Sequence, residues 1–570
     1  MKLIIKQYLA SLKERDELDA VLPDLLSQLG LNVYSRPSRG TRQAGVDVAA
    51  VGRLAGGTEK VYLFSIKPGD LTRSSWDGDA VQSLRPSLNE ILDTYIPNHL
   101  PNEHRDKDVV VCLCLGGDIQ EQVRPQVKGF IAQNKRDNIA FEEWNGDKLA
   151  ELILSSFLRE DLLPQNARSQ LRKSLALLDE PEASYHYFSA LIRSLSSAES
   201  AKNKNQIMAI RQMNICLWIL FAWARDAGNL ESAYLSSELA LLHAWKIART
   251  YSAKKTKAAK AIQFAFNSFL VVYRQISSQY LVEKILPHAH KRHALSVAVQ
   301  PSCSLDVNLK LFDVLGRVAM GGIWAYWRTQ TVGKDETEIL EQTWREVQSF
   351  SVAIRQIILN NPTLLLPIKD DQVIDISITV FLLMIDSNNH SDIKQWLSEI
   401  VERATFAHKI HGLYPCNLSS YSELLLHPHQ NNESYREEVT GGSILFPMIA
   451  LCASLLGDIG LYNQVQYIKQ KHLSHSNFQF WYPDELSEEH FYTNSDAHGA
   501  TLSDACIDRS SDEFVNQAFT ECENTPYFKT LSAVGVGLWP LILVACRHYR
   551  IPVPLHLMEG FVKLYKHHSS

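Results

Sequence analysis

The chain has 570 residues, of which 45% are hydrophobic and 21% charged, and its net charge is −6. This length is enough for two or three globular domains, each with its own core. A negative net charge means that the overall electrostatic field of the protein does not attract nucleic acid. Any contact with nucleic acid therefore requires a local basic surface. Nine cysteines without a Cys-x-x-Cys pair argue against a disulfide framework and against structural zinc, and they favour a reducing cytosol.

The first 36 residues predict a helix followed by a strand. Leucines at helical spacing give the helix, over residues 3–30, one buried face, and Gly30 supplies its stop. The strand covers residues 31–36. We expect this helix and this strand to be the first two elements of a domain that contains a β-sheet.

Residues 45–67 predict a β-hairpin, with two apolar strands on either side of a Gly-Gly turn. The second strand, residues 61–67, is rich in the β-branched and aromatic residues that strands prefer. Because side chains alternate between the faces of a strand, Ser65 and Lys67 share one face, and the hairpin can place Asp47 beside Lys67. Burying an acid and a lysine at the edge of a sheet costs free energy unless the two groups pair, so such residues are expected to pair or to take part in chemistry.

Alternating helices and strands continue to about residue 165. Four apolar side chains at helical spacing mark the buried face of a helix over residues 74–95: Leu88, Ile91, Leu92 and Tyr95. The next strand, residues 108–115, is an unbroken apolar run, as expected for a strand that is covered on both faces. The remaining elements are a helix ending near residue 131, a strand over residues 139–144 and a helix over residues 148–157. This order predicts an α/β domain.

The element order and the Asp47 and Lys67 pattern resemble the PD-(D/E)xK nuclease superfamily, the restriction-endonuclease-like fold, over roughly residues 1–165. The tripeptide that begins at Gly45 and ends at Asp47 resembles the Gly-x-Asp variant of Mrr-type restriction nucleases. The resemblance implies an endonuclease that hydrolyses DNA, RNA being the less favoured substrate, with Mg²⁺ or Mn²⁺. Fusions of this kind look like cytoplasmic effectors of bacterial restriction or antiphage defence.

The same resemblance implies roles for individual residues. Asp47 would bind the metal, with the carbonyl of Ile66 completing the shell, and Lys67 would orient or help to deprotonate the attacking water. Carboxylate ligands and a divalent ion suit this chemistry, because the ion offsets the charge that develops on the phosphoryl group. The family usually carries Glu, Asp or Gln where this chain has Ser65, which would hydrogen-bond a ligand or the phosphate.

The second carboxylate must therefore come from elsewhere. Some superfamily members with Ser-x-Lys recruit it from the following helix, where Glu90 is the candidate metal ligand; three nearer alternatives are Asp70, Asp77 and Asp79. The first helix of the superfamily often carries a further acid, here Glu14 or Glu17, although a solvated acidic face explains these two equally well. Without a replacement, the domain would be an inactive nuclease fold that binds nucleic acid or a protein partner.

Two basic segments are candidates for contact with a nucleic-acid backbone. One is the loop before Asp47, where guanidinium groups could grip phosphate: Arg36, Arg39 and Arg42, together with Gln43. The other lies within residues 245–260, which hold six cations and no acid, among them Lys254, Lys255 and Lys257. A solvated loop and a solvated helix face are the competing interpretations.

From residue 166 to residue 570 the sequence predicts an all-α region, an irregular α-solenoid or bundle without a fixed repeat. Such regions act in sensing, in homo-oligomerisation or in binding a protein partner. Residues 361–371 could divide it into two domains. Residues 472–512 form a long polar segment whose histidines lack zinc-ligand spacing. The apolar runs at residues 444–456 and 531–546 are too short to span a membrane and predict buried helices.

Overall fold

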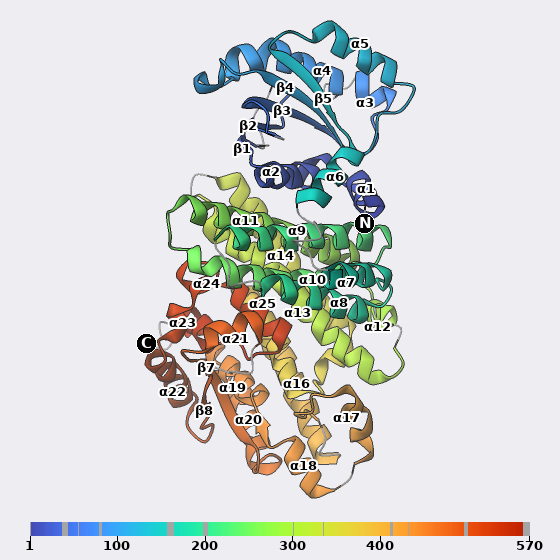
Figure 1. The fold of residues 1–570 in the computed structure, drawn as a ribbon. Coiled ribbons are helices and arrows are strands. Elements are labelled where there is room, and N and C mark those ends of the chain that lie inside the picture. Colours follow the sequence, from blue (N-terminus) through green and yellow to red (C-terminus); the bar gives the residue numbers. More distant parts are fainter. Residues whose placement is uncertain are drawn as a thin grey trace. The chain divides into compact units, whose positions relative to one another are not determined.

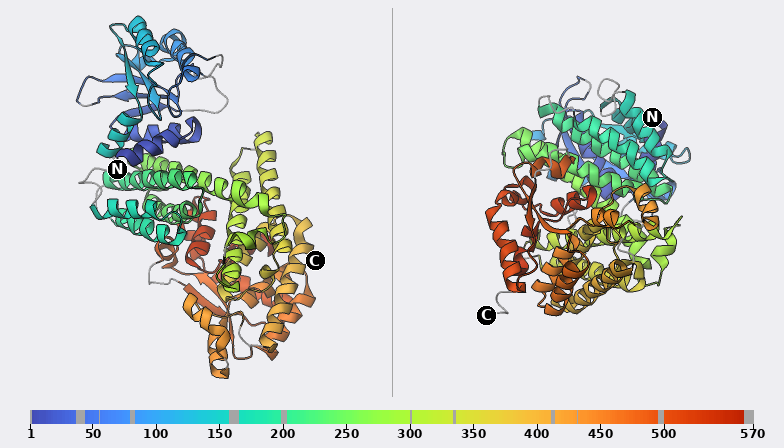
Figure 2. Two further views of the ribbon diagram at one scale, coloured as in Figure 1. Left: turned by 90° about the vertical axis from the view of Figure 1, so that its right-hand side faces the viewer. Right: turned by 90° about the horizontal axis from the view of Figure 1, so that it is seen from below.

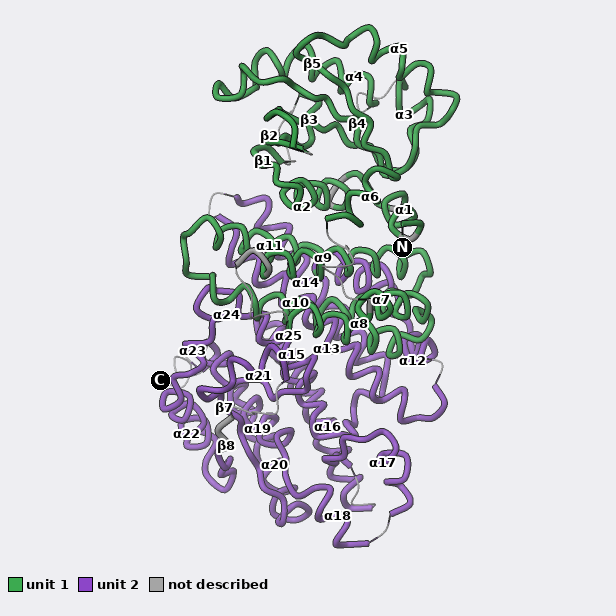
Figure 3. Tube along the Cα trace, viewed as in Figure 1, with its two compact units in different colours: residues 1–273 green, residues 274–570 purple. Residues whose placement is uncertain are grey.

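The computed structural model describes most of the chain. The described residues are 2–36, 44–54, 56–78, 83–156, 165–197, 203–299, 301–333, 336–410, 414–430, 432–494 and 500–562. By compactness the chain forms two units, residues 1–273 and residues 274–570 (Figure 3). The first unit contains a five-stranded sheet, and both units are rich in helices.

The sheet in the first unit has the strand order β1-β2-β3-β4-β5. Its strands are β1 Asn32–Ser35, β2 Val48–Gly52, β3 Lys60–Lys67, β4 Val109–Leu115 and β5 Ile139–Trp144. β1, β2 and β3 pair in antiparallel fashion, whereas β3, β4 and β5 run parallel. The predicted strands of the N-terminal domain are therefore confirmed, and the sheet is mixed.

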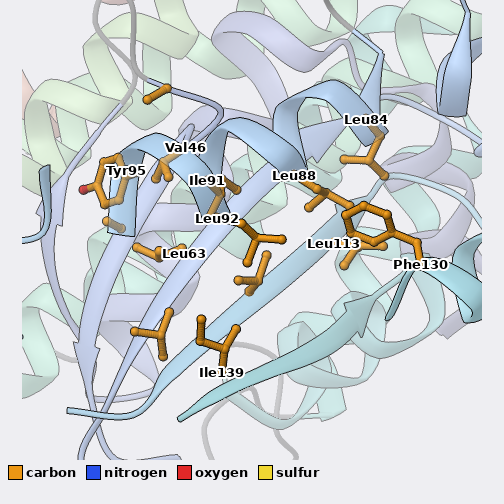
Figure 4. Close-up of a cluster of buried hydrophobic side chains, with 14 of the residues drawn as sticks. Val46, Leu63, Leu84, Leu88, Ile91, Leu92, Tyr95, Leu113, Phe130 and Ile139 are labelled. Atoms are coloured by element: carbon orange, nitrogen blue, oxygen red, sulfur yellow. The ribbon is translucent and has the colours of Figure 1, made fainter. Parts of the chain in front are cut away.

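Helices cover both faces of this sheet (Figures 1 and 2). One layer holds α1 Lys2–Ser11, α2 Asp19–Gln28 and α6 Gly146–Ser156; the other holds α3 Arg73–Asp77, α4 Leu84–Glu90 and α5 Arg124–Asn134. All seven residues of β4 are buried, as expected for a central parallel strand. Figure 4 shows side chains from α4 and the segment after it lying over β3, β4 and β5 in the core.

Two helices predicted as continuous are interrupted. The predicted helix over residues 3–30 becomes α1, a π-helical segment Glu14–Leu18 and α2. The break occurs at Lys13, whose backbone is extended and whose N–H donates to the Glu17 carboxylate at 2.8 Å. The predicted helix over residues 74–95 becomes α3, α4 and a π-helical segment Ile91–His99. α3 ends because Gly78 is extended at φ −79°, ψ 170°.

The rest of the first unit is helical: α7 Gln165–Ala176, α8 Pro181–Ser196, α9 Asn203–Asp226, α10 Glu231–Ala248 and most of α11 Lys257–Ser278. The sequence did not predict α7. Residues 206–226 of α9 are long and apolar enough to cross a membrane, but 83% of the most apolar stretch is buried inside the fold. This is the behaviour of a core helix, and among the described residues no other helix passes the same test.

The second unit is mostly helical. Its helices are α12 Ala294–Ala298, α13 Ser304–Thr331, α14 Thr337–Asn360, α15 Val373–Met384, α16 His390–Ile410, α17 Tyr421–Leu426, α18 Glu433–Val439, α19 Leu445–Leu455, α20 Ile459–Lys471, α21 Ser487–Thr493, α22 Ser511–Asn524, α23 Tyr527–Thr530, α24 Ser532–Gly535 and α25 Pro540–Tyr549. The predicted division at residues 361–371 lies between α14 and α15. α19 is buried along its whole length, as predicted for the first apolar run.

The prediction that the C-terminal region is all-α is wrong for part of it. Three strands form a second sheet: β6 Gly442–Ser443, β7 Asn477–Pro483 and β8 Ala500–Asp504. β7 pairs in parallel with β6 and in antiparallel fashion with β8. Its sequence, NFQFWYP, is aromatic and mostly buried, which is a strand signal. The polar residues on both sides of it concealed this signal in residues 472–512.

One buried acid in the first unit gives the fold a pH dependence. Asp24 of α2 is 7% exposed, and its Oδ1 atom has no hydrogen-bond partner among the described residues. Burial raises the pKa of Asp24 to about 6, while Arg211 and Arg36 act in the opposite direction. The protonated form therefore stabilises the fold at pH values below about 4, the pKa of an unfolded Asp, and this contribution is lost as the pH rises through 6.

We expect the substitution Asp24→Asn to remove this dependence. A pKa difference of about two units corresponds to about 3 kcal/mol, so the variant should gain up to this amount relative to wild type between pH 4.5 and pH 7.5. Thermal melting at both pH values measures the gain. Asp93→Asn, at an exposed position, is the control. An equal difference between Asp24→Asn and wild type at both pH values would contradict the assignment.

Candidate active site

Asp47 lies at the start of β2 and is attached to β3. Its N–H donates to the carbonyl of Phe64 at 2.9 Å, and Val48 pairs with Phe64, so Asp47 lies opposite Ser65. The N–H of Ile66 donates to Asp47 Oδ2 at 2.7 Å. The hairpin thus places the Asp47 carboxylate against the backbone of Ile66, the middle residue of the Ser-x-Lys tripeptide.

Lys67, the last residue of β3, forms an ion pair with Glu14. The distance from Lys67 Nζ to Glu14 Oε2 is 3.3 Å, and the two side chains are 9% and 29% exposed. Removing a lysine ammonium from water is costly unless an opposite charge compensates it. Glu14 comes from the π-helical segment before α2, and such segments occur often at functional sites. A carboxylate from the first helical layer therefore reaches the end of β3.

Ser65 and Ile66 are both buried in β3, at 1% and 0% exposure. The hydroxyl of Ser65 has no hydrogen-bond partner among the described residues. A buried hydroxyl without a partner costs on the order of 1–3 kcal/mol, and a ligand that accepts or donates there would remove this cost. In β4, where Cys114 pairs with Ile66, burial and the charge of Asp47 raise the pKa of the Cys114 thiol, so this thiol is a core group and not a nucleophile.

The remaining acids predicted for the site differ in position. Glu90 is the last residue of α4 and is half-buried; the apolar face expected to hold its turn against the sheet is present in the core. Asp70 Oδ1 accepts the N–H of Asp118 at 2.8 Å, which fixes the loop after β4. Asp77 pairs with Arg85 at 2.6 Å. Asp79 lies outside the described residues.

Glu17 is fully buried and holds the first helical layer in place. Its Oε1 atom lies 2.7 Å from Arg225 of α9, and its Oε2 atom accepts the N–H of Lys13. This acid therefore fixes the segment that carries Glu14, and among the described residues it is Glu14 that pairs with Lys67. No local sequence pattern points to Arg225, because only the fold brings α9 beside the π-helical segment.

The residues predicted to contact nucleic acid differ in burial, and some of them lie outside the described part of the chain. Arg36 is half-buried, with its guanidinium carbon 3.6 Å from the centre of the Phe264 ring, and burial lowers its pKa. Arg39, Arg42 and Gln43 lie outside the described residues. Three exposed lysines follow α10, with the Lys254 ammonium 4.9 Å from the Tyr251 ring: Lys254, Lys255 and Lys257. The amide of Gln263 holds this turn by donating to three of its carbonyls.

The side chains near the end of β3 include oxygen donors of the kind that a hard divalent cation binds. Asp47 and Glu14 supply carboxylate oxygens, which Mg²⁺ and Mn²⁺ prefer, and the unsatisfied hydroxyl of Ser65 is an additional oxygen. Lys67 supplies a positive charge for a phosphate or for water. Comparison of the chain with family models, with curated proteins and with solved structures finds no significant match.

Proposed function

We propose that residues 1–165 form a nuclease domain of PD-(D/E)xK type that hydrolyses phosphodiester bonds of DNA with Mg²⁺ or Mn²⁺. The observation that carries this proposal is the open end of the β2–β3 hairpin, where the Asp47 carboxylate accepts the N–H of Ile66 and Lys67 pairs with Glu14. A mixed five-stranded sheet with helices on both faces supports the proposal, because it follows the α/β element order on which the resemblance rests. Three segments contribute polar side chains near the end of β3: the π-helical segment with Glu14, the start of β2 with Asp47, and β3 with Ser65 and Lys67.

In this proposal each residue has a distinct role. Asp47 and Glu14 would hold the cation, which supplies positive charge to offset the charge on the phosphoryl group. Lys67 would donate a hydrogen bond to the attacking water or to a phosphate oxygen. Ser65 would donate its hydroxyl to a ligand or to the phosphate. In this proposal Glu14 takes the ligand role that the sequence predicts for Glu90, because its carboxylate lies 3.3 Å from Lys67 at the end of β3.

The helical remainder would recognise a trigger, a protein partner or a second copy of the chain, as in cytoplasmic effectors of bacterial restriction or antiphage defence. It has the character of an irregular solenoid or bundle. The exposed lysines Lys254, Lys255 and Lys257 would extend the nucleic-acid contact within the first unit, because they form a positive surface on a chain whose net charge is negative.

A cleavage assay tests the function. We expect the purified chain to cut plasmid or linear DNA faster than RNA with Mg²⁺ or Mn²⁺, and EDTA to stop the reaction. Asp47→Asn keeps the size of the side chain but removes the charge that holds the ion, and it should lower the rate by at least about 100-fold. Asp93→Asn, an exposed change in the same domain, should retain activity.

Two results would contradict this function. Equal cutting by wild type and Asp47→Asn would place the activity elsewhere. Absence of cutting on every substrate, with nucleic-acid binding retained, would favour the inactive, nucleic-acid-binding form of this fold.

A further inference from the structure

Three metal-binding side chains meet near the end of the second unit, far in sequence from the candidate nuclease site. They are Cys522 of α22, His556 of the short 3-10 helix Leu555–Met558, and Glu559 directly after it. A ligand atom of each lies within 4.8 Å of a ligand atom of both others. Cys522 and His556 are 2% and 5% exposed, and Glu559 is half-buried. In the part of the chain that the structure describes, this is the one such cluster.

The ring of His556 is held as metal-binding histidines are usually held. Its Nε2 atom lies 3.0 Å from the carbonyl oxygen of Cys522 and 3.1 Å from that of Thr525. Carbonyl oxygens only accept, so Nε2 carries the proton and donates it. The ring also stacks on Phe528, with 4.8 Å between centroids and 12° between planes. A second nitrogen fixed by a backbone carbonyl sets the tautomer and the orientation of a ligating imidazole.

This tautomer leaves Nδ1 of His556 as an unprotonated acceptor. Nδ1 is buried and has no hydrogen-bond partner among the described residues. A buried acceptor without a partner is costly, and a bound cation would satisfy it. This observation is independent of the proximity of the three side chains, and it indicates that a ligand belongs at this position.

The surroundings of Cys522 disfavour a nucleophilic thiolate. Burial raises the pKa of the Cys522 thiol, and the carboxylates of Glu559, Glu521 and Glu523 raise it further, with Lys529 acting in the opposite direction. Reactive thiols need a positive environment that favours the thiolate. A divalent cation would supply this charge, and the thiol would release its proton to solvent when the metal binds.

We propose that Cys522, His556 and Glu559 bind a zinc ion that joins α22 to the C-terminal segment. Sulfur, nitrogen and one carboxylate oxygen are a donor set that suits Zn²⁺ and not Mg²⁺ or Ca²⁺. At zinc bond lengths of about 2.0–2.3 Å, the ligand atoms would lie about 3–4 Å apart, so they need to close by only about 1 Å. Three protein ligands leave a fourth position for water.

Metal content measures this directly. The full chain, purified without chelators and carrying Asp47→Asn to disable the nuclease site, should contain about one zinc per chain. Cys522→Ser and Glu559→Ala should each lower the zinc affinity by at least about 100-fold, since each removes a direct ligand. Cys452→Ser is the matched control, because Cys452 of α19 is equally buried, at 2% exposure, and lies outside the cluster. This control should retain the zinc.

Cobalt substitution separates a ligand from a structural residue. Co²⁺ bound to the apo chain should show a thiolate-to-cobalt charge-transfer band, absent in Cys522→Ser and present in Cys452→Ser. Zinc should also raise the melting temperature of wild type and not that of Glu559→Ala, whose half-exposed position tolerates alanine. A wild-type chain without zinc and without the cobalt band would overturn the proposal, as would equal zinc content in all variants.

Discussion

Lys67→Ala should lower the rate of metal-dependent cleavage by at least about 100-fold, in the range that removal of a proton-transferring or charge-stabilising group produces. Lys67 is buried at the end of β3, and Glu14 at 3.3 Å compensates its charge. A buried ammonium has three donors, so beside its contact with Glu14 it can hydrogen-bond water or a phosphate oxygen, and alanine removes this group without adding bulk. Cleavage rates at saturating DNA and Mg²⁺ give the comparison.

Lys60→Ala is the matched control, because Lys60 begins the same strand at the end opposite to Lys67. It should cleave as wild type does. Full activity in Lys67→Ala would refute the proposed site. Lys67→Arg keeps the charge but changes its shape and reach, so it should recover only part of the rate.

Glu14→Gln distinguishes two roles of the acid. If Glu14 is a metal ligand, the Mg²⁺ concentration for half-maximal cleavage should rise at least about tenfold in this variant. If Glu14 only compensates Lys67, this concentration should stay at the wild-type value while the maximal rate falls. The titration therefore tests the assignment of Glu14 independently of the role of Lys67.

The strands of the N-terminal sheet could be predicted from the sequence because their signal is local. β5 has the predicted bounds, Ile139–Trp144, and β4 is the apolar run expected of a strand buried on both faces. The helical breaks could not be predicted in the same way. The break at Lys13 depends on Glu17, whose buried position is compensated by Arg225 from a helix some two hundred residues later in the chain. Only the tertiary structure brings these charges together.

The candidate sites also combine features that local sequence signals predict with features that only the tertiary structure determines. Hairpin register is a local property, and from it we predict Asp47 beside Lys67. The register places Asp47 opposite Ser65, with its carboxylate on the N–H of Ile66, while Lys67 pairs with Glu14. The choice among Glu14, Glu17 and Glu90 depends on how helices pack on the sheet, which residue spacing does not determine. The Cys522 cluster has one local signal, a His-x-x-Glu spacing of three residues, while the cysteine comes from another helix. A pattern of paired cysteines does not detect a cluster that has one cysteine.

Gly45→Ala should destabilise the N-terminal domain by at least about 3 kcal/mol, which lowers the melting temperature of a domain of this size by roughly 6–12 °C. Gly45 has φ +80°, a conformation that costs an L-residue about 1–2 kcal/mol. A Cβ atom at this position would lie 2.0 Å from the carbonyl oxygen of Ser87 in α4 and 3.1 Å from Ile91. The helix backbone cannot yield cheaply, because the same helix packs into the core through Leu84 and Leu88.

Gly56→Ala separates the two contributions. Gly56 has φ +77°, nearly the same conformation, but a Cβ atom there would meet nothing within 4 Å. This variant should therefore show only the conformational cost of about 1–2 kcal/mol and should cleave DNA as wild type does. In Gly45→Ala the displaced chain continues directly into Asp47, so the molecules that remain folded should also lose cleavage. Equal melting temperatures for the two variants would show that the close approach of Gly45 to α4 adds no cost beyond that of the backbone conformation, and full cleavage by Gly45→Ala would show that this approach does not position Asp47.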